Sequence, residues 1–135
     1  DYNGKISLLD RLASKYSNSP YAINALYEKG RSYVQSNNSR QAIATFRELL
    51  SKYPESPISR KAAAEIGLLY YQNDDYDRAI EAYKYVVTQY PGSEEARLAM
   101  RDLKSIYVDA HRADEFAALA AQMVRFVLNP ANKTL

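Results

Sequence analysis

A repeat of 37 residues is the feature that most constrains how this chain can fold. Its clearest copy covers residues 53–89, and shifting that copy by 37 residues in either direction reproduces much of it. The backward shift pairs Tyr53 with Tyr16, Pro57 with Pro20, Ala62 with Ala25, Gly67 with Gly30, Tyr70 with Tyr33, Ala79 with Ala42, Ile80 with Ile43 and Tyr83 with Phe46. The forward shift pairs Tyr53 with Tyr90, Pro54 with Pro91, Ser56 with Ser93 and Tyr70 with Tyr107. A fixed period of this size that contains two helical segments predicts a helical solenoid.

Each copy divides into two segments with helical apolar periodicity on either side of a short polar turn, and this pattern predicts two antiparallel helices. We therefore expect an all-α, right-handed α–α superhelix of about seven helices, forming a single solenoid over residues 1–130. Its expected parts are the second helix of a truncated repeat at 1–16, repeats at 17–52 and 53–89, a degenerate repeat at 90–128, and a mobile tail at 129–135.

Serine followed by proline marks the expected start of the first helix in two copies, at Ser19–Pro20 and Ser56–Pro57. A serine hydroxyl can accept hydrogen bonds from the unpaired amides of a helix start, and proline at the first helical position has no amide to satisfy. Clusters of turn formers at 36–39 and 73–75 then predict the reversal between the two helices. Asn129–Pro130 is expected to end the last helix.

Small residues recur where the two helices of a copy should cross. Gly30 and Gly67 remove a side chain from the first helix, and Ala42 and Ala79 do the same on the second. The third copy departs from this pattern, because Lys104 replaces the glycine. Its second helix also exchanges the small and large residues, which are Phe116 and Ala120. Such an exchange preserves the packed volume.

Composition excludes several functional classes. The 18 basic and 16 acidic residues give a net charge of +2, which is too balanced for a nucleic-acid-binding surface. The sequence has no cysteine and therefore no disulfide or thiol chemistry. No apolar segment approaches the roughly 18 residues of a membrane-spanning helix, so we expect no membrane insertion by this segment. An upstream signal or lipid anchor stays open.

Both ends of the pattern predict surfaces that need a covering. The second helix at 1–16 lacks its first helix, so an apolar face near Leu9 is expected to lack its cover. Phe126 and Val127 are expected to stay partly exposed at the other end. We interpret the chain as a section of a longer array, and self-association through 6–12 or 126–128 is the alternative.

An enzyme is the competing class of protein. The only histidine, His111, lies near Asp109 and Asp114, a combination that could support acid–base chemistry. We favour a turn histidine beside helix-capping aspartates. The sequence 74–77 resembles a cation site, but it lacks the glycine and the distal glutamate of a calcium loop. No phosphate-binding glycine loop or nucleophile motif is present, and we predict no catalytic residue, metal or cofactor.

The repeating residues resemble the tetratricopeptide repeat (TPR) family, in which a glycine, a tyrosine, an alanine, an aromatic residue and a proline fall at set places of a helix–turn–helix unit. Those places are filled by Gly30, Tyr33, Ala42, Phe46 and Pro54, and then by Gly67, Tyr70, Ala79, Tyr83 and Pro91. The period of 37 residues exceeds the usual 34. The tryptophan common in the first helix is replaced by Leu26 and Ala63.

The longer period and the Tyr-Pro-x-Ser connections resemble the TPR proteins of the bacterial envelope. That group includes the Tol–Pal-associated periplasmic protein and the lipoprotein of the barrel-assembly machinery. This resemblance implies a periplasmic or outer-membrane-associated protein of a Gram-negative bacterium that works in a larger envelope assembly for cell division or the outer membrane. A cytoplasmic location is the alternative.

The TPR resemblance also implies that the chain binds a protein or peptide along a concave face lined by the first helices. The lining residues implied by position are Asn24, Tyr27, Glu28, Arg31, Val34, Gln35, Lys61, Glu65, Leu68, Tyr71, Gln72, Arg101, Asp102, Ser105 and Val108. Our hypothesis is that the apolar anchors are Tyr27, Leu68 and Tyr71. Acidic groups would be held by Arg31 and Arg101.

Two alternatives remain for this surface. Tyr27 and Tyr71 could instead cover seams between helices, because a chain with 13 tyrosines must place many of them structurally. The whole chain could also act as a structural spacer or self-association module in a longer array. A clamp for a C-terminal carboxylate, built from lysines and asparagines in some TPR proteins, is not expected, because Tyr27 and Arg31 occupy the relevant places.

Overall fold

The structure is a computed structural model that describes residues 1–17 and 19–128, with side chains described through Arg125. Within these residues there are seven α-helices and no strand: α1 (Tyr2–Lys15), α2 (Pro20–Gln35), α3 (Ser39–Lys52), α4 (Pro57–Gln72), α5 (Tyr76–Gln89), α6 (Glu94–Asp109) and α7 (Ala113–Leu128). This result confirms the predicted all-α fold of seven helices. The predicted tail, the helix end at 129–130 and the exposure of the side chains at 126 and 127 lie outside the described residues.

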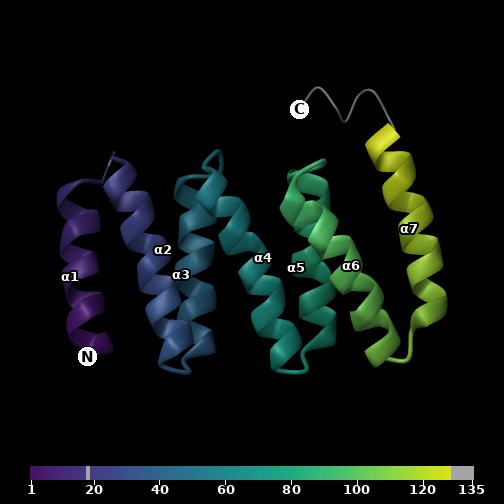
Figure 1. Ribbon diagram of the computed structural model, residues 1–135, viewed down its shortest axis with the longest axis horizontal. Helices are drawn as coiled ribbons and strands as arrows, with labels where there is room; N and C mark the ends of the chain where they lie inside the picture. The colour runs from purple at the N-terminus through teal and green to yellow at the C-terminus, as the bar shows by residue number, and fades with distance from the viewer. Residues whose placement is uncertain (18, 129–135) are drawn as a thin grey trace. The chain divides into compact units, whose positions relative to one another are not determined.

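The chain falls into two compact units that divide between Leu69 and Tyr70. In unit 1, the helices α1, α2 and α3 lie side by side and alternate in direction, and α4 follows as far as Leu69 (Figure 1). Unit 2 holds the end of α4 and the helices α5, α6 and α7, and α6 runs antiparallel to both α5 and α7 (Figure 1). The single solenoid and the repeat boundaries expected from the sequence remain predictions.

The core of unit 1 is centred on Phe46 and Leu49 of α3, which are both 0% exposed. Gly30 of α2 lies directly against this core. A Cβ atom at that glycine would lie only 2.3 Å from Cε1 of Phe46, so no side chain fits between α2 and α3. The lack of space at this crossing explains why the repeat has a glycine there.

The core of unit 2 is built from α5 and α6. Its buried side chains include Tyr83 and Val86 of α5 and Leu103, Ile106 and Tyr107 of α6. Helix α7 contributes less: Leu119 and Met123 are its only buried side chains among those described.

The degenerate third repeat differs from the others as the sequence indicated. Lys104, which replaces the crossing glycine, is exposed on α6. Phe116 and Ala120 of α7 are half-buried, and the ring of Phe116 lies 6.1 Å from that of Tyr107. The large residue of α7 therefore stands one turn earlier than its counterparts, Phe46 of α3 and Tyr83 of α5, and its ring lies near an aromatic ring of α6.

The three helix–turn–helix reversals share one backbone geometry. Asn37, Asp74 and His111 are 37 residues apart and have positive φ angles of 61°, 59° and 58°. In each turn, the amide of the residue after the one with positive φ donates to the carbonyl oxygen five residues earlier. These bonds run from Asn38 to Tyr33 at 2.8 Å, from Asp75 to Tyr70 at 2.9 Å and from Arg112 to Tyr107 at 2.7 Å. This is the Schellman ending of a helix, with its left-handed residue at the same repeat position each time.

The second helices begin with side-chain caps at the same spacing. The carboxylate of Asp1 accepts from the amide of Asn3, the side-chain oxygen of Asn38 from Gln41, and the carboxylate of Asp75 from Arg78. These bonds satisfy amides that the first turn of a helix leaves free. The fourth copy of this position is Arg112, which cannot accept a hydrogen bond.

The serines before the first helices behave differently from one another. Ser56 Oγ accepts from the Ile58 amide at 3.2 Å, as predicted for a cap, and Ser93 Oγ likewise accepts from the Ala96 amide at 3.0 Å. The prediction is wrong at Ser19, where the hydroxyl donates to the carbonyl oxygen of Tyr16 at 2.7 Å. Its hydrogen bond therefore closes the preceding turn instead of capping α2.

Candidate partner-binding surface

All fifteen residues predicted to line a binding face are exposed or half-buried, and none belongs to the core. Nine of them lie in unit 1, on α2 and on α4 up to Leu68. The other six lie in unit 2, at the end of α4 and on α6. The two groups are described separately below, because each unit has its own internal contacts.

In unit 1, a polar cluster joins α2 and α4, each of which is the first helix of its repeat. The hydroxyl of Tyr27 on α2 donates to Oε1 of Glu65 on α4 at 2.6 Å, and Nη1 of Arg31 donates to Oε2 of the same carboxylate at 3.3 Å. The ring of Tyr27 also lies 5.8 Å from that of Phe46. Burial, followed by the hydrogen bond to Glu65, raises the pKa of Tyr27 above its usual value near 10.

The three side chains of this cluster were all predicted from the sequence to line a partner-binding face. Both oxygens of Glu65 are occupied, and the Arg31 guanidinium is already paired with a carboxylate whose side chain is 21% exposed. The ring of Tyr27 on α2 lies against the ring of Phe46 on α3, which is the kind of contact that the alternative role of this tyrosine requires. The side chain of Arg31 is still 39% exposed, so it can meet a partner without leaving Glu65.

In unit 2, Tyr71 makes a corresponding contact. Its hydroxyl donates to the carboxylate of Asp109 at the end of α6, and its ring lies 6.0 Å from Tyr76 of α5. The hydrogen bond to Asp109 is the largest of the causes that raise the pKa of Tyr71 to about 12. Tyr27 and Tyr71 therefore both tie one first helix to a carboxylate 38 residues later.

A third tyrosine–carboxylate pair lies deeper in unit 2. Burial raises the pKa of Tyr83 above its usual value, and Asp102 on α6 raises it further by charge and by a hydrogen bond. Nε of Arg101 lies 3.6 Å from Oδ1 of the same Asp102. Asp102, predicted as part of a partner surface, therefore already has a cation of its own helix beside it.

Sequence reasoning missed these internal acceptors, although it contained a signal for them. Glu28, Glu65 and Asp102 are spaced by 37 residues, so each first helix carries a carboxylate at the same position. Lys5 of α1 lies 3.9 Å from Glu28, which means that each of the three carboxylates has a partner inside its unit. A recurring acidic position next to recurring tyrosines predicts such pairing better than it predicts an acidic binding site.

Other first-helix side chains remain open to solvent. Leu68 on α4 is 42% exposed in unit 1, and Val108 on α6 is 53% exposed in unit 2. The side chain of Arg101 is 69% exposed despite its contact with Asp102. Each unit thus presents an apolar residue on a first helix, and in unit 2 a cation also lies on that helix.

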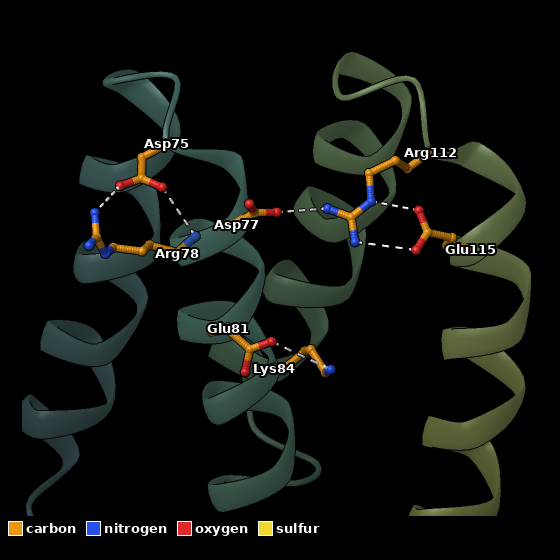
Figure 2. A network of polar contacts seen from close by, with 7 residues as sticks. All are labelled: Asp75, Asp77, Arg78, Glu81, Lys84, Arg112 and Glu115. Carbon is orange, nitrogen blue, oxygen red and sulfur yellow. Dashed lines mark hydrogen bonds and ion pairs between the residues drawn. The ribbon is translucent and has the colours of Figure 1, made fainter.

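The turn region of unit 2 contains the other residues that the sequence singled out. Arg112 bridges Asp77 of α5, at 2.9 Å, and Glu115 of α7 (Figure 2). Its guanidinium also lies 5.4 Å from the centre of the Tyr107 ring. A hollow of about 400 Å³ lies beside it, lined by the two turns that contain Asp74 and His111. Among the described residues, no three histidine or acidic side chains are placed to hold a metal ion.

The position of His111 has a structural explanation. It occupies the same left-handed turn position as Asn37 and Asp74, and its side chain is exposed. Asp74 and Asp75 serve the neighbouring turn, where Asp75 caps α5 and also pairs with Arg78 at 2.9 Å (Figure 2). Turn geometry therefore accounts for His111 and Asp74, and helix capping accounts for Asp75.

The paired helices, the uniform turns and the exposed first-helix side chains define a helical-repeat protein of the kind that presents a surface to other proteins. The tetratricopeptide repeat profile matches residues 27–94, which is half of the chain. The chain belongs to the tetratricopeptide repeat family, whose members generally act as non-catalytic scaffolds for protein–protein interaction.

A solved structure supports the fold. The chain is similar to a crystal structure of nearly identical TPR-like repeats, described as a kinesin light chain of Podosopora anserina, with 16% sequence identity and a TM-score of 0.65. The match covers 92% of this chain and 66% of that one, so the chain spans just under two thirds of its structural neighbour. No match was found among curated proteins. No helix within the described residues is long and apolar enough to cross a membrane.

Proposed function

We propose that this protein is a binding scaffold whose first helices hold an extended or helical segment of a partner protein. The observation that carries the proposal is the exposure of Leu68 and Val108, at 42% and 53%, on helices whose other apolar residues are largely buried. Exposed apolar residues beside polar groups are typical of protein-binding surfaces when they lie on a rigid framework. The tetratricopeptide family supports this mode of action.

The charges nearby favour a particular kind of partner segment. The side chain of Arg101 is 69% exposed, and its Nε lies 3.6 Å from Oδ1 of Asp102. Its guanidinium therefore remains accessible to a partner. Arg31 is also partly accessible beside its carboxylate. We therefore propose that each unit binds a segment that combines apolar side chains with acidic ones. Leu68 contributes most to this affinity in unit 1, and Arg101 and Val108 contribute most in unit 2.

A display library of short random peptides provides the test. Peptides selected on the parent protein are measured by fluorescence anisotropy against Leu68→Ser, Arg101→Ala and Val108→Ser. We expect Leu68→Ser to weaken the peptides that bind unit 1 about tenfold, and Arg101→Ala and Val108→Ser to weaken those that bind unit 2 by a similar factor. The matched control is Tyr85→Ser on α5, because Tyr85 is 40% exposed on a second helix. Peptides that respond to Tyr85→Ser and ignore the three first-helix changes would refute the proposal.

The cellular setting is a separate proposal. We propose that the chain works in a larger assembly of the bacterial envelope, in the periplasm or at the outer membrane. Its support is the resemblance of the period of 37 residues and the Tyr-Pro-x-Ser connections to envelope TPR proteins. Immunodetection after osmotic shock should find the native protein in the periplasmic or envelope fraction. Recovery with the cytoplasmic fraction would contradict this setting without affecting the binding proposal.

A further inference from the structure

Helix α6 carries a run of cations on one side. Arg97, Arg101 and Lys104 follow one another at three or four residues, so they lie on the same side of the helix, and Val108 continues that side by one more turn. The side chains of Arg97 and Arg101 are 64% and 69% exposed, Lys104 is exposed, and Val108 is 53% exposed. We call these four residues the α6 stripe, and all of them are accessible to a partner.

Two of these cations are particular to α6. The equivalents in α4 and α2, which lie 37 and 74 residues earlier, are glycine in both helices at the position of Lys104, and alanine and tyrosine at that of Arg101. Arg97 has one charged equivalent, Arg60 of α4. The packing of the repeat therefore does not require a cation at either of the two middle positions of the stripe.

The neighbouring carboxylates leave these two positions open to an acidic group. Both oxygens of Glu94 accept from Arg97, at 2.5 and 3.0 Å, so the charge of Arg97 is already balanced. Arg101 has only the contact of its Nε with Asp102 at 3.6 Å. Lys104 has no ion pair within the part of the chain that the structure describes. An incoming segment thus meets a balanced charge at Arg97 and two accessible cations on the next two positions.

A hollow of about 390 Å³ lies at the Arg97 end of the stripe. Its apolar lining comes from Val87 of α5, Pro91 of the α5–α6 connection, and Ala96 and Met100 of α6. This volume is within the range of clefts that hold apolar groups. The stripe therefore has an apolar site at each end, because its last residue is an exposed valine.

We propose that unit 2 binds an acidic amphipathic helix that lies along the α6 stripe. This inference rests on the proposed function of unit 2 and specifies its partner segment. The helix places two carboxylates against Arg101 and Lys104, one apolar side chain in the hollow and another on Val108. The stripe has intervals of four, three and four residues, so the partner reads apolar-x-x-x-Glu-x-x-Glu-x-x-x-apolar. These intervals are the same in both chain directions.

A helix suits this surface better than an extended segment. The backbone groups in the interior of α6 are used by the helix itself, so an extended segment would find no main-chain partners there. A helical partner satisfies its own backbone groups. It also presents side chains on one face at intervals of three and four residues, which match the intervals of the stripe.

A designed peptide provides the probe. It has about 20 residues and is rich in alanine, so that it forms a helix in water. It carries leucine, glutamate, glutamate and leucine at the intervals given above. The control peptide has the same composition, but both glutamates are moved by two positions to the other side of the helix. Fluorescence anisotropy with the full chain at low salt should show about fivefold tighter binding of the designed peptide.

Substitutions in the protein locate the contact. Lys104→Gln and Arg101→Gln should each weaken the designed peptide about threefold at low salt, and both effects should shrink as salt is added. The matched control is Lys84→Gln on α5, which removes the same charge from unit 2 outside the stripe. A peptide with lysine in place of the glutamate that faces Lys104 should bind weakly to the parent and regain affinity for Lys104→Glu.

The outcomes separate this inference from the proposed function. A designed peptide that fails to bind, or that binds no better than its control, overturns the helix proposal. Peptides from the display library that depend on Arg101 and Val108 but ignore Lys104→Gln overturn it too, while leaving the proposed function intact. If those peptides ignore Arg101 and Val108 as well, both fail. Dimers in sedimentation equilibrium that dissociate on Lys104→Glu would also overturn the helix proposal, because a second copy would then occupy the stripe.

Discussion

Replacement of Gly30 by alanine is the most direct test of how α2 packs on α3. The new Cβ would lie 2.3, 2.7 and 2.8 Å from three ring carbons of Phe46, whereas carbon atoms in good contact are about 3.5–4.0 Å apart. The ring would have to move by about 1 Å to restore that distance. It cannot swing into solvent, because Phe46 is 0% exposed and its ring packs against Tyr27.

Two opposing effects set the size of the change. Overpacking of a well-filled core costs about 1–3 kcal/mol. Alanine in a helix interior recovers about 1 kcal/mol relative to glycine. Because three ring atoms are involved, we expect the upper part of the overpacking range and a net loss of about 1–2 kcal/mol in the free energy of unfolding.

Urea unfolding followed by circular dichroism measures this loss. The matched control is Gly4→Ala on α1, where the nearest group to a new Cβ is the flexible, exposed carboxylate of Asp1 at 3.2 Å. That change should stabilise the protein by up to about 1 kcal/mol. In a Phe46→Leu background, the penalty of Gly30→Ala should largely disappear. Equal stabilisation by the two glycine replacements would refute the packing described here.

Three further predictions concern buried or strained groups. Ser32 Oγ is buried and has no hydrogen-bond partner within the described residues, so Ser32→Ala should stabilise the protein by about 1 kcal/mol in urea unfolding. The control is Ser59→Ala, which removes a hydroxyl that has a hydrogen bond and should destabilise the protein by about 1 kcal/mol. His111→Gly should raise stability by about 0.5–1 kcal/mol by relieving a left-handed conformation, and Gly92→Ala, at φ 81°, should lower it by about 1 kcal/mol. Because the folded-state pKa of Tyr27 is raised, its contribution is fully present below the unfolded-state value of about 10 and is lost as pH rises above it. The advantage of the parent over Tyr27→Phe should therefore narrow in stability measurements above pH 10, and an unchanged difference would contradict the contact with Glu65.

Most of the fold could be predicted because the repeat shows the same physical requirement several times. A glycine at position 30 alone indicates little, but a glycine 37 residues later, each followed by a tyrosine three positions on, indicates a close helix crossing. The ends of the helices could also be predicted, since proline and turn-forming residues act on the local backbone. Ser19 shows the limit, because its hydroxyl closes the preceding turn without capping α2, whereas the hydroxyl of Ser93 does both. This difference depends on the exact backbone path.

The candidate surface was harder to predict for a different reason. The sequence placed Tyr27, Arg31 and Glu65 at exposed repeat positions, and the structure agrees with that placement. It could not show that these side chains bond to one another, because each pair is separated by more than 30 residues and depends on how α2 and α4 are spaced. Periodicity identifies the side of a helix that faces outward, whereas the use of each exposed group depends on its neighbours in space.

The uniform reversals at Asn37, Asp74 and His111 have a consequence for how this chain tolerates duplication. Each first helix ends with the same left-handed residue and the same amide-to-carbonyl bond five residues back. A duplicated block of 37 residues inserted at one of these positions would therefore bring its own helix ending and leave the ends of its neighbours intact. Length can thus change by whole blocks in one event, whereas an insertion of another length inside a helix would rotate the residues that follow it in that helix away from their partners.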